Sequence, residues 1–408
     1  MFATPLAVLR LAWRSVRRRP LSSILTALVV ALGVALVIAV ETVRASADRS
    51  FTETARGYDV ILGPPQGSPL QVVLSTLFHV DEPPGTLPWS AFDKIEKDPR
   101  VAAAIPYAMG DTYRGHRVVG TVPAMFDVLT DGDGRKLEEG MRGRVFGDGR
   151  FEAVVGSAVA SRTGLGIGTT FGVSHGLVEG GQPHGERWAV VGVLRPTGTA
   201  HDRAIYIPIE TFYAIPGHTV PGQEEGQRPL SAVGVRLKSP ALRLLILQEY
   251  RTETAGAQAV LPSDQVRKLM TIVGDVNRGV TLVAWIVTIV AAVSILVGLY
   301  NTIQGRRREI AVLRALGARP AHVFGLILLE ALILCLLGGA LGLLLGHAGV
   351  AAAAPTLLES YGVKVEVGLG SYDLQVLGAL VVLGLLAGLL PAWRGLTTPV
   401  ADNLQAEP

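Results

Sequence analysis

The sequence contains a single cysteine, Cys335, among its 408 residues. One thiol cannot form a disulfide within the chain, so every folded domain must be stable through its own hydrophobic core. Charged residues are also scarce, at 17% of the chain, against about 25% in typical soluble domains. Because 49% of the residues are hydrophobic, the composition favours a protein with a large membrane-embedded part.

Motifs for nucleotide binding and metal-dependent catalysis are missing as well. No GxxxxGK[ST] loop is present to bind ATP phosphates, and neither HExxH nor CxxC occurs. The glycine-rich stretch 164–168 has the wrong spacing for a dinucleotide-binding fingerprint, and we interpret it as a turn. The acidic turn at 131–134 lacks the ligand spacing of an EF-hand. We therefore predict a chain without catalytic activity of its own.

The hydrophobic residues concentrate in four runs, at 21–40, 279–300, 323–350 and 374–393. A bilayer core of about 30 Å requires about 20 helical residues, and each run reaches that length. The long stretch between the first two runs is mixed in character and rich in glycine and proline, which is typical of a water-soluble domain. Its short apolar segments alternate between strand-like and helix-like patterns, so we predict an α+β fold for it.

Arginines flank the apolar runs on one side only. Five stand before the first run and five lie between the second and third runs, and short arginine-rich loops stay in the cytoplasm. We therefore predict cytoplasmic N- and C-termini and an extracytoplasmic domain. A cleaved signal peptide over 1–47, ending in the "ASA" at 45–47, is the alternative, but its apolar run exceeds the 7–15 residues of such peptides. The arginines are Arg10, Arg14, Arg17, Arg18, Arg19, Arg306, Arg307, Arg308, Arg314 and Arg319.

These assignments divide the chain into nine segments along the sequence. In order, we predict a cytoplasmic segment at 1–20, a first span and stalk at 21–56, an extracytoplasmic domain at 57–262, a stalk and second span at 263–300, a cytoplasmic coupling loop at 301–322, a third span at 323–350, an extracytoplasmic loop at 351–372, a fourth span at 373–393 and a cytoplasmic tail at 394–408.

The predicted spans contain almost no ionisable groups. Transporters that carry polar solutes through the bilayer place charged residues or broken helices at mid-membrane, whereas here Glu330 is the single acid inside a run. We interpret the spans as levers rather than as the lining of a pore. Gly338, Gly342 and Gly346 recur every four residues and predict a face for close helix packing, although glycines that simply face lipid are the alternative.

The segment between the second and third spans begins with three arginines, which end the second span. After them, Ile310, Leu313 and Leu316 lie near one face of a short helix. Gly317 suits the end of this helix and Pro320 the first turn of the next one. Such an amphipathic helix could rest on lipid headgroups or bind a cytoplasmic partner, and the pattern alone does not choose between them.

The run "RRREIAVLRALGARPAHVFGLILLEALIL" is similar to the signature segment of the FtsX/MacB-type permeases of ABC transporters. "LLPAWRGLTTPVADNL" (389–404) resembles the closing motif of that family, and "VVGSAVASRTGLGIGTTF" and "VVGVLRPTGTAHDRAIYIPIE" resemble its MacB-like periplasmic domain. The resemblance assigns ATPase coupling to Arg308, Glu309, Ile310, Leu313, Arg314, Leu316 and Gly317, with Glu330 in the following span.

The resemblance implies an α-helical membrane protein with four transmembrane helices and a large α+β extracytoplasmic domain of two subdomains. Porter-like parts would lie at about 57–140 and 225–262, and an inserted subdomain at about 141–224. It implies a bacterial inner-membrane location and a permease that couples ATP hydrolysis to motion of its outer domain, for export or extraction of a substrate. An FtsX-like signalling protein, or a component of a metal-handling transporter, is the alternative.

The resemblance also implies the partners. A separate cytoplasmic ABC ATPase would hold ATP and Mg, and a second permease copy, identical or paralogous, would pair in the membrane. Membrane lipids and a periplasmic adaptor or substrate protein complete the set, and no nucleic acid is expected. The chain itself is expected to hold no nucleotide cofactor.

Six histidines fall in the predicted outer domain: His79, His116, His175, His184, His201 and His218. Zinc takes three or four nitrogen, sulfur or oxygen ligands, and a glycine-rich loop carries His175 and His184 while His201 stands beside Asp202. We predict His175, His184, His201 and His79 as candidate zinc ligands if their loops converge. Solvated loop histidines are the alternative.

Overall fold

The computed structural model describes residues 5–18, 20–131, 133–176, 181–218, 228–250, 256–305, 312, 319–361 and 363–396. The chain divides into two compact units. The helical unit comprises Met1–Arg44, Gly274–Ala352 and Glu366–Pro408, and the sheet unit comprises Ala45–Val273 and Ala353–Val365.

Four long helices contain the four apolar runs, as the hydropathy predicts. They are α2 (Pro20–Ala55), α9 (Pro262–Gly305), α11 (Pro320–Tyr361) and α12 (Ser371–Leu396), and each has a stretch long and apolar enough to cross a membrane. A short amphipathic helix, α1 (Pro5–Arg18), precedes them. The first part of the segment predicted as a loop at 351–372 is helical as far as Tyr361, because the alanine-rich start of this stretch favours helix.

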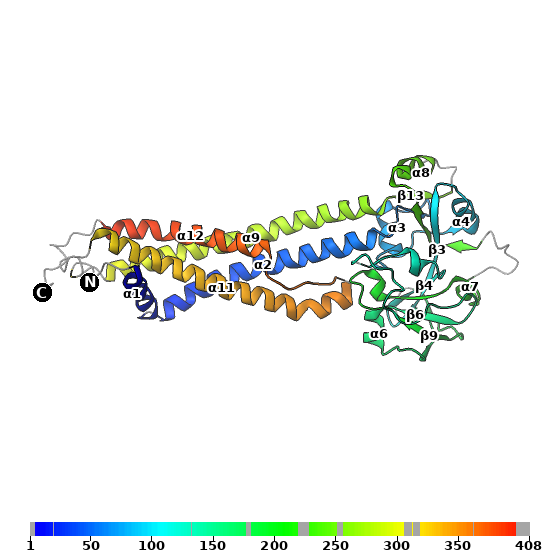
Figure 1. Ribbon diagram of the computed structural model, residues 1–408, viewed down its shortest axis with the longest axis horizontal. Helices are drawn as coiled ribbons and strands as arrows, with labels where there is room; N and C mark the ends of the chain where they lie inside the picture. Colours follow the sequence, from blue (N-terminus) through cyan, green and yellow to red (C-terminus); the bar gives the residue numbers. More distant parts are fainter. Residues whose placement is uncertain are drawn as a thin grey trace. The chain divides into compact units, whose positions relative to one another are not determined.

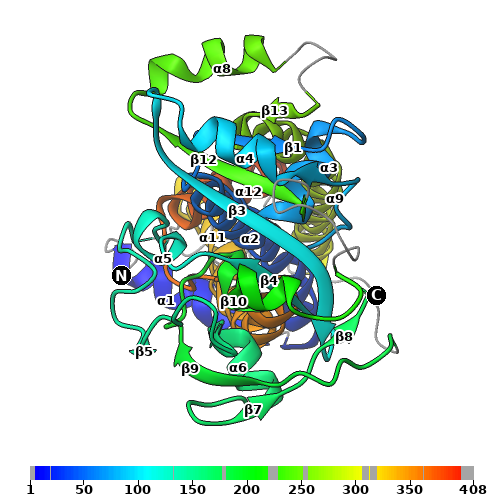
Figure 2. The same ribbon diagram turned by 90° about the vertical axis from the view of Figure 1, so that its right-hand side faces the viewer.

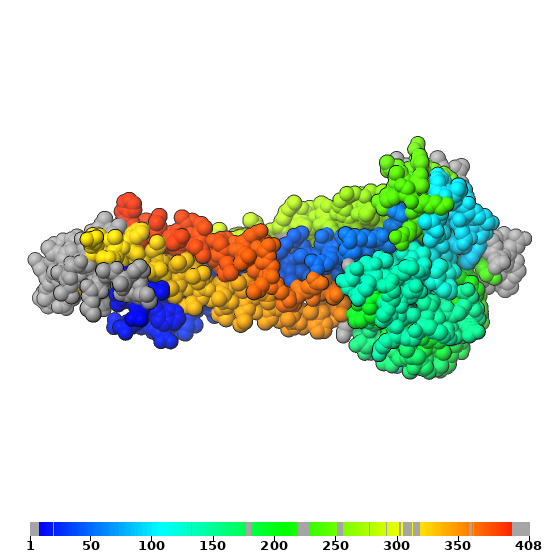
Figure 3. All heavy atoms as spheres, in the orientation of Figure 1, coloured from blue at the N-terminus to red at the C-terminus, as the bar shows by residue number. Residues whose placement is uncertain are grey.

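Glycines let the helices of the helical unit approach closely. A Cβ atom on Gly338 or Gly342 would lie 2.6 Å from the Cβ atom of Val30 or Val34 in α2, and one on Gly346 would lie 3.0 Å from Ile38. Only a residue without a side chain fits at such distances, so this face of α11 packs directly on α2. Figure 3 shows α11 and α12 lying against each other as well, and Gly384 and Gly388 of α12 sit over Cys335 and Ala331 of α11.

The sheet unit is built on one mixed sheet of eleven strands with the order β13-β1-β12-β3-β4-β10-β6-β9-β5, where β7 pairs with β9 and β8 with β3. A separate small sheet pairs β11 with β2. The strands are β1 (Val60–Gly63), β2 (Leu87–Pro88), β3 (Val101–Tyr113), β4 (His116–Thr121), β5 (Arg142–Gly143), β6 (Glu152–Val155), β7 (Thr170–Phe171), β8 (Ser174–His175), β9 (Trp188–Val193), β10 (Ala204–Pro208), β11 (Pro229–Leu230), β12 (Ala232–Leu237) and β13 (Gln258–Val260).

Short helices connect and cover these strands, which gives the predicted α+β fold (Figure 1). They are α3 (Pro69–Thr76), α4 (Trp89–Glu96), α5 (Met125–Val128), α6 (Ser157–Thr163), α7 (Ile209–Tyr213) and α8 (Arg243–Glu249), with 3-10 turns η1 (Ala200–Arg203) and η3 (Pro240–Leu242). Side chains alternate across the sheet, as its two-residue period requires. In β10, Ile205 and Ile207 enter one buried cluster while Ala204 and Tyr206 enter the other.

Strand β3 joins the two halves of the sheet (Figure 2). Its first half pairs with β12, and its second half pairs with β4 and β8. Because β4 in turn pairs in parallel with β10, the sheet runs without interruption through the parts that the sequence assigns to a porter-like and an inserted subdomain. The second half of β3 also carries the first residue of the candidate site.

Candidate metal centre

A buried aspartate, Asp111, lies near the end of β3 at a β-bulge. The pairing of β3 with β4 shifts between Met109 and Asp111, which leaves Gly110 as the extra residue. Bulges bend a strand locally and redirect its side chains, and they recur beside functional sites. Here the bulge precedes an acidic side chain that is 0% exposed. The partner of Asp111 on the other edge of β3 is His175 in β8.

His175 and His184 come from the two limbs of one hairpin-like loop. The His175 amide donates to the Gln182 carbonyl at 2.9 Å, and the His184 amide donates to the Val173 carbonyl at 2.9 Å. Next to β3, the Gly176 amide donates to the Gly110 carbonyl at 2.8 Å, and Gly176 has a left-handed backbone with φ of 94°. The backbone of the loop therefore holds both histidines against the bulge, as the sequence predicts for this glycine-rich stretch.

The third histidine, His218, arrives from the segment after α7. Its Nδ1 atom lies 2.9 Å from the Phe212 carbonyl oxygen, and its ring packs on the Phe212 ring with centroids 4.4 Å apart. Phe212 in turn sits tightly on β4, since a Cβ atom on Gly120 would lie 2.8 Å from the Phe212 Cβ atom. A hydrogen bond and an aromatic contact thus fix the orientation of the imidazole.

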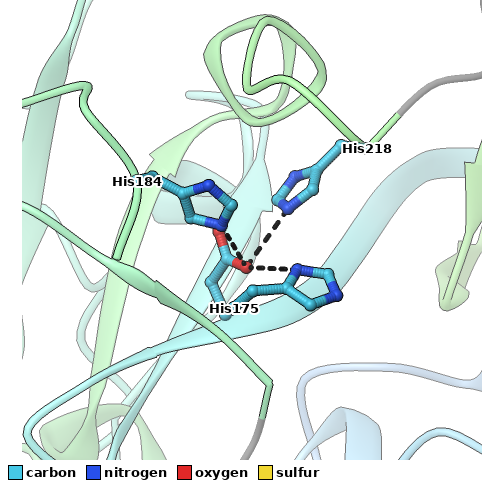
Figure 4. A group of neighbouring side chains, drawn as sticks. His175, His184 and His218 are labelled. Atoms are coloured by element: carbon cyan, nitrogen blue, oxygen red, sulfur yellow. Dashed lines mark ion pairs between the residues drawn. The ribbon is translucent and has the colours of Figure 1, made fainter. Parts of the chain in front are cut away.

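The three imidazoles surround the carboxylate of Asp111 (Figure 4). From its Oδ1 atom, the distances are 3.4 Å to His175 Nδ1, 3.4 Å to His184 Nε2 and 3.2 Å to His218 Nε2. The side chains of His218 and His184 are 3% and 12% exposed, whereas that of His175 is 59% exposed. One ligand atom from each of the four residues lies within 4.8 Å of the others. We call these four residues the His₃Asp cluster.

His201 and His79, the other two predicted ligands, are not part of this cluster. They lie around Tyr206: His201 Nδ1 is 2.8 Å from the Tyr206 hydroxyl, and the His79 ring stands edge-on to the Tyr206 ring. Burial lowers the pKa of His201 to about 4. Burial, followed by the nearby charge of His201, lowers the pKa of His79 well below its ordinary range. The predicted set of four histidines was therefore wrong in these two members, because their rings lie around Tyr206 and not around Asp111.

The loop also contains a sequence pattern that suggests a nucleophile. Residues 172–176 read GVSHG and match the GxSxG motif of serine hydrolases. That motif acts when its serine sits on a turn between a strand and a helix. Ser174 instead lies within β8, opposite Thr112 of β3, and is followed by the hairpin loop. The pattern is therefore a coincidence of this glycine-rich loop, and its histidine is the functional candidate.

Comparison with known families agrees with the architecture. A family model described as the MacB-like periplasmic core domain matches residues 23–251, and one described as the FtsX-like permease C-terminal domain matches residues 281–400. The first match alone spans more than half of the chain. The chain belongs to the MacB/FtsX family of ABC transporter permeases.

Individual relatives of this permease are distant. It is 38% identical over 112 residues to a macrolide export ATP-binding/permease protein MacB of Nitrobacter winogradskyi, and this alignment covers 26% of this chain and 17% of that one. It is 29% identical over 168 residues to the MacB of Bordetella avium, and this alignment covers 38% of this chain and 24% of that one. An uncharacterised ABC transporter permease of Methanocaldococcus jannaschii is 26% identical over 54% of this chain and 56% of its own length. The matches thus span about a fifth of the two MacB proteins.

Two solved domains are similar to parts of the permease. The periplasmic region of MacB from Actinobacillus actinomycetemcomitans aligns with a TM-score of 0.32 at 14% identity, over 53% of this chain and 95% of that one. The extracellular domain of the transporter YknZ from Gram-positive bacteria aligns with a TM-score of 0.29 at 16% identity, over 49% of this chain and 98% of that one.

The residues that the sequence assigns to the permease's ATPase coupling lie outside the described residues: Arg308, Glu309, Ile310, Leu313, Arg314, Leu316 and Gly317. Glu330 is described and is 5% exposed. It lines a cavity of about 30 Å³ together with Ser23 and Thr26 of α2. The acid of the third span is thus buried among small polar side chains of the helical unit.

Proposed function

We propose that this permease converts ATP binding and hydrolysis in a separate ATPase into motion of its sheet unit, for export or extraction of a substrate on the outer side of the membrane. One observation carries the proposal. Helix α2 ends in the sheet unit and helix α9 begins there, and each helix contains an apolar span without a break between the two parts. A continuous helix transmits displacement along its axis, because its backbone hydrogen bonds resist bending.

The side chains of the spans support this role. In α9 the Thr288 hydroxyl donates to the Ala284 carbonyl at 2.8 Å, and the Ser294 hydroxyl donates to the Val290 carbonyl at 2.9 Å. These hydroxyl groups therefore satisfy the backbone of their own helix and offer no donor to a passing solute. A permease that moves polar cargo between its helices would need unsatisfied polar or ionisable groups at mid-membrane.

We further propose a topology and an assembly. The arginine distribution puts the N-terminus, the segment 301–322 and the C-terminus in the cytoplasm of a bacterial inner membrane, and the sheet unit outside. Permeases of this family work with ABC ATPases. We assign the ATPase contact to the segment 306–319, with two permease copies side by side. The macrolide named in MacB relatives is one candidate cargo class among exported compounds.

The coupling segment offers a direct test. We predict that Leu313→Asp and Leu316→Asp, each tested alone, abolish copurification of the cytoplasmic ATPase, because a charge on the apolar face of a short amphipathic helix removes its docking surface. Ala311→Asp is the matched control, since helical spacing puts residue 311 on the opposite face. Affinity purification from the native host followed by detection of the ABC ATPase gives the result.

Two outcomes of this experiment differ in meaning. Loss of the ATPase from both leucine variants, with a sheet unit that still resists proteolysis, supports the proposal. Normal recovery of the ATPase with both leucine variants would refute the assigned interface, and with it the route by which we propose that force enters the helices.

A further inference from the structure

We propose that the His₃Asp cluster is a binding site for a divalent transition metal ion of the zinc class, and that the ion exchanges with the solvent outside the membrane. The ligands would be the Asp111 carboxylate, His175 Nδ1, His184 Nε2 and His218 Nε2. This inference rests on the sheet unit alone and does not depend on the proposed coupling to an ATPase.

Two buried aspartates of the sheet unit have different surroundings. Asp202 is 0% exposed and accepts hydrogen bonds from the Thr197 amide, the Thr197 hydroxyl and the Gly198 amide at 2.9 to 3.1 Å. Asp111 is equally buried, yet neither of its carboxylate oxygens has a hydrogen-bond partner among the described residues. A buried carboxylate without donors is strongly unfavourable, so Asp111 requires a cation.

The histidines around Asp111 do not supply that charge through hydrogen bonds. Although the nitrogen-to-oxygen distances are short, the Nε2 atoms of His184 and His218 make no hydrogen bond of acceptable geometry within the described part of the chain. Three protonated imidazoles around one carboxylate would also repel one another. A metal ion accounts for both facts, since ligand atoms then point at a shared centre rather than at each other.

The tautomer of His218 strengthens this point. Its Nδ1–H donates to the Phe212 carbonyl at 2.9 Å, which in a neutral imidazole leaves a lone pair on Nε2. That lone pair faces the Asp111 Oδ1 atom at 3.2 Å. Two acceptors at this distance repel unless a cation lies between them. A hydrogen bond from the far ring nitrogen to a carbonyl is also the usual way in which proteins orient a metal-ligating histidine.

The distances fit a tetrahedral ion. Zinc–nitrogen and zinc–oxygen bonds of about 2.0–2.2 Å give ligand-to-ligand edges of about 3.3–3.6 Å, because a tetrahedron's edge is about 1.63 times its bond length. The three distances from Asp111 are 3.2, 3.4 and 3.4 Å. All four ligand atoms lie within 4.8 Å of one another, close enough for one ion to contact each of them.

The ligand types select the class of ion. Calcium and magnesium take oxygen ligands almost exclusively, whereas imidazole suits zinc, copper and nickel. A divalent ion bound by three neutral imidazoles and one carboxylate has a net charge of +1. Asp111 supplies that carboxylate. With the His175 side chain 59% exposed and the other ligands at most 12% exposed, an ion can enter and leave from the His175 side.

The test uses the full-length, tag-free permease in detergent, stripped of metal by a chelator, and zinc titrated by calorimetry. We predict saturable binding of about one zinc ion per chain that excess calcium or magnesium does not displace. Asp111→Asn and His218→Gln should each weaken zinc binding more than about 100-fold, since loss of even an indirect ligand contact costs 10- to 100-fold. His322→Ala, which removes a histidine from the other unit, should leave the affinity unchanged.

Cobalt substitution and stability measurements complete the design. Cobalt bound at the site should show the intense visible absorption of a tetrahedral complex, and Asp111→Asn should abolish it. In metal-free protein, Asp111→Asn should unfold at the same or a higher temperature, because the substitution removes no hydrogen bond to the carboxylate. Asp202→Asn should lower the unfolding temperature and keep zinc binding, because its carboxylate already has protein donors.

The outcomes decide between a metal site and a purely structural cluster. Zinc binding that is lost with Asp111→Asn, while the variant keeps its fold and stability, supports the proposal. Absence of saturable zinc binding in the wild type would overturn it, as would equal zinc affinity in the wild type, Asp111→Asn and His218→Gln. Ordinary ATPase copurification in each of these variants is expected, so failure here and failure of the proposed coupling can be told apart.

Discussion

The two units of this permease differ in how their buried groups are packed. In the described part of the helical unit, glycines make close contacts with apolar side chains, the Thr288 and Ser294 hydroxyls bond to their own helix, and Glu330 and Asp373 are buried acids. In the sheet unit, the core contains ionisable side chains such as Asp111, Asp202 and His201. The difference suggests a division of labour in which ligand chemistry takes place outside the membrane and the helices only transmit motion.

The strongest way to break this comparison is to disturb the glycine face of α11. Gly342→Leu should destabilise the permease by about 3 kcal/mol or more, because overpacking of a tight interface costs about 1–3 kcal/mol and backbone contacts cannot yield. A Cβ atom at this position would lie 2.6 Å from the Val34 Cβ atom and 2.7 Å from the Ala31 carbonyl oxygen. Thermal unfolding of the purified protein measures the effect.

Gly349→Leu in the same helix is the matched control, since a Cβ atom at this position would meet no heavy atom of a neighbouring element within 4 Å. It should unfold near the wild-type temperature. If both variants lose the same stability, the cost comes from the helix itself rather than from its packing on α2, and the glycine face has no special role.

A smaller effect should separate the two groups of histidines in the sheet unit. The pKa of His201 is lowered by burial to about 4, below its ordinary value of about 6.5. The unfolded chain therefore binds a proton more readily, so stability is fully present above pH 6.5 and is lost as the pH falls toward 4. For a fully buried imidazole this amounts to about 3 kcal/mol at most.

The measurement is the unfolding free energy of the metal-free protein between pH 7.5 and pH 4. His201→Asn should flatten the curve, because asparagine keeps a polar group near the Tyr206 hydroxyl but does not titrate. His79 lies beside His201, and Arg117 and Arg203 add positive charge there, so part of the slope should remain. An unchanged slope in His201→Asn would mean that the pKa of His201 is the same in the folded and unfolded chain, which would contradict this account.

The sequence predicts the architecture well because that architecture depends on local signals. Runs of about 20 apolar residues set the spans, and the alternation of short strands and helices sets the α+β class. The end of the third span was predicted less well. Helix α11 continues to Tyr361 and includes Pro355, a residue that usually breaks a helix, so the sequence did not indicate this extension.

The sequence predicted two of the four residues of the His₃Asp cluster, His175 and His184. His175 and His184 stand close together in a glycine-rich loop, which is a local signal. Asp111 lies 64 residues before His175, and only the pairing of β3 with β8 brings them together. The spacing of residues along the sequence does not predict how strands from distant segments pair. The sequence signal that could have indicated Asp111 is an acid in an otherwise apolar strand. For His218 the signal was weaker, and it was the aromatic residue Phe212 upstream.

His79 and His201 illustrate the opposite error. Residue type and a predicted outer location made them candidates, yet His201 is buried and the ring nitrogens of His79 are buried, both beside Tyr206. A histidine becomes a ligand when its lone pair converges with others on a shared point, and a count of histidines cannot show that convergence.

The most direct test of the proposed division of labour is amide hydrogen exchange in the permease reconstituted with its ATPase. The segments to follow are 45–55 at the end of α2 and 262–273 at the start of α9, both in the sheet unit. With a hydrolysis-deficient ATPase, addition of ATP and Mg should change the exchange rates of both segments. If ATP changes the exchange rates only in the cytoplasmic segments and not in 45–55 or 262–273, the helices do not transmit the effect of ATP binding to the sheet unit, and the account is contradicted.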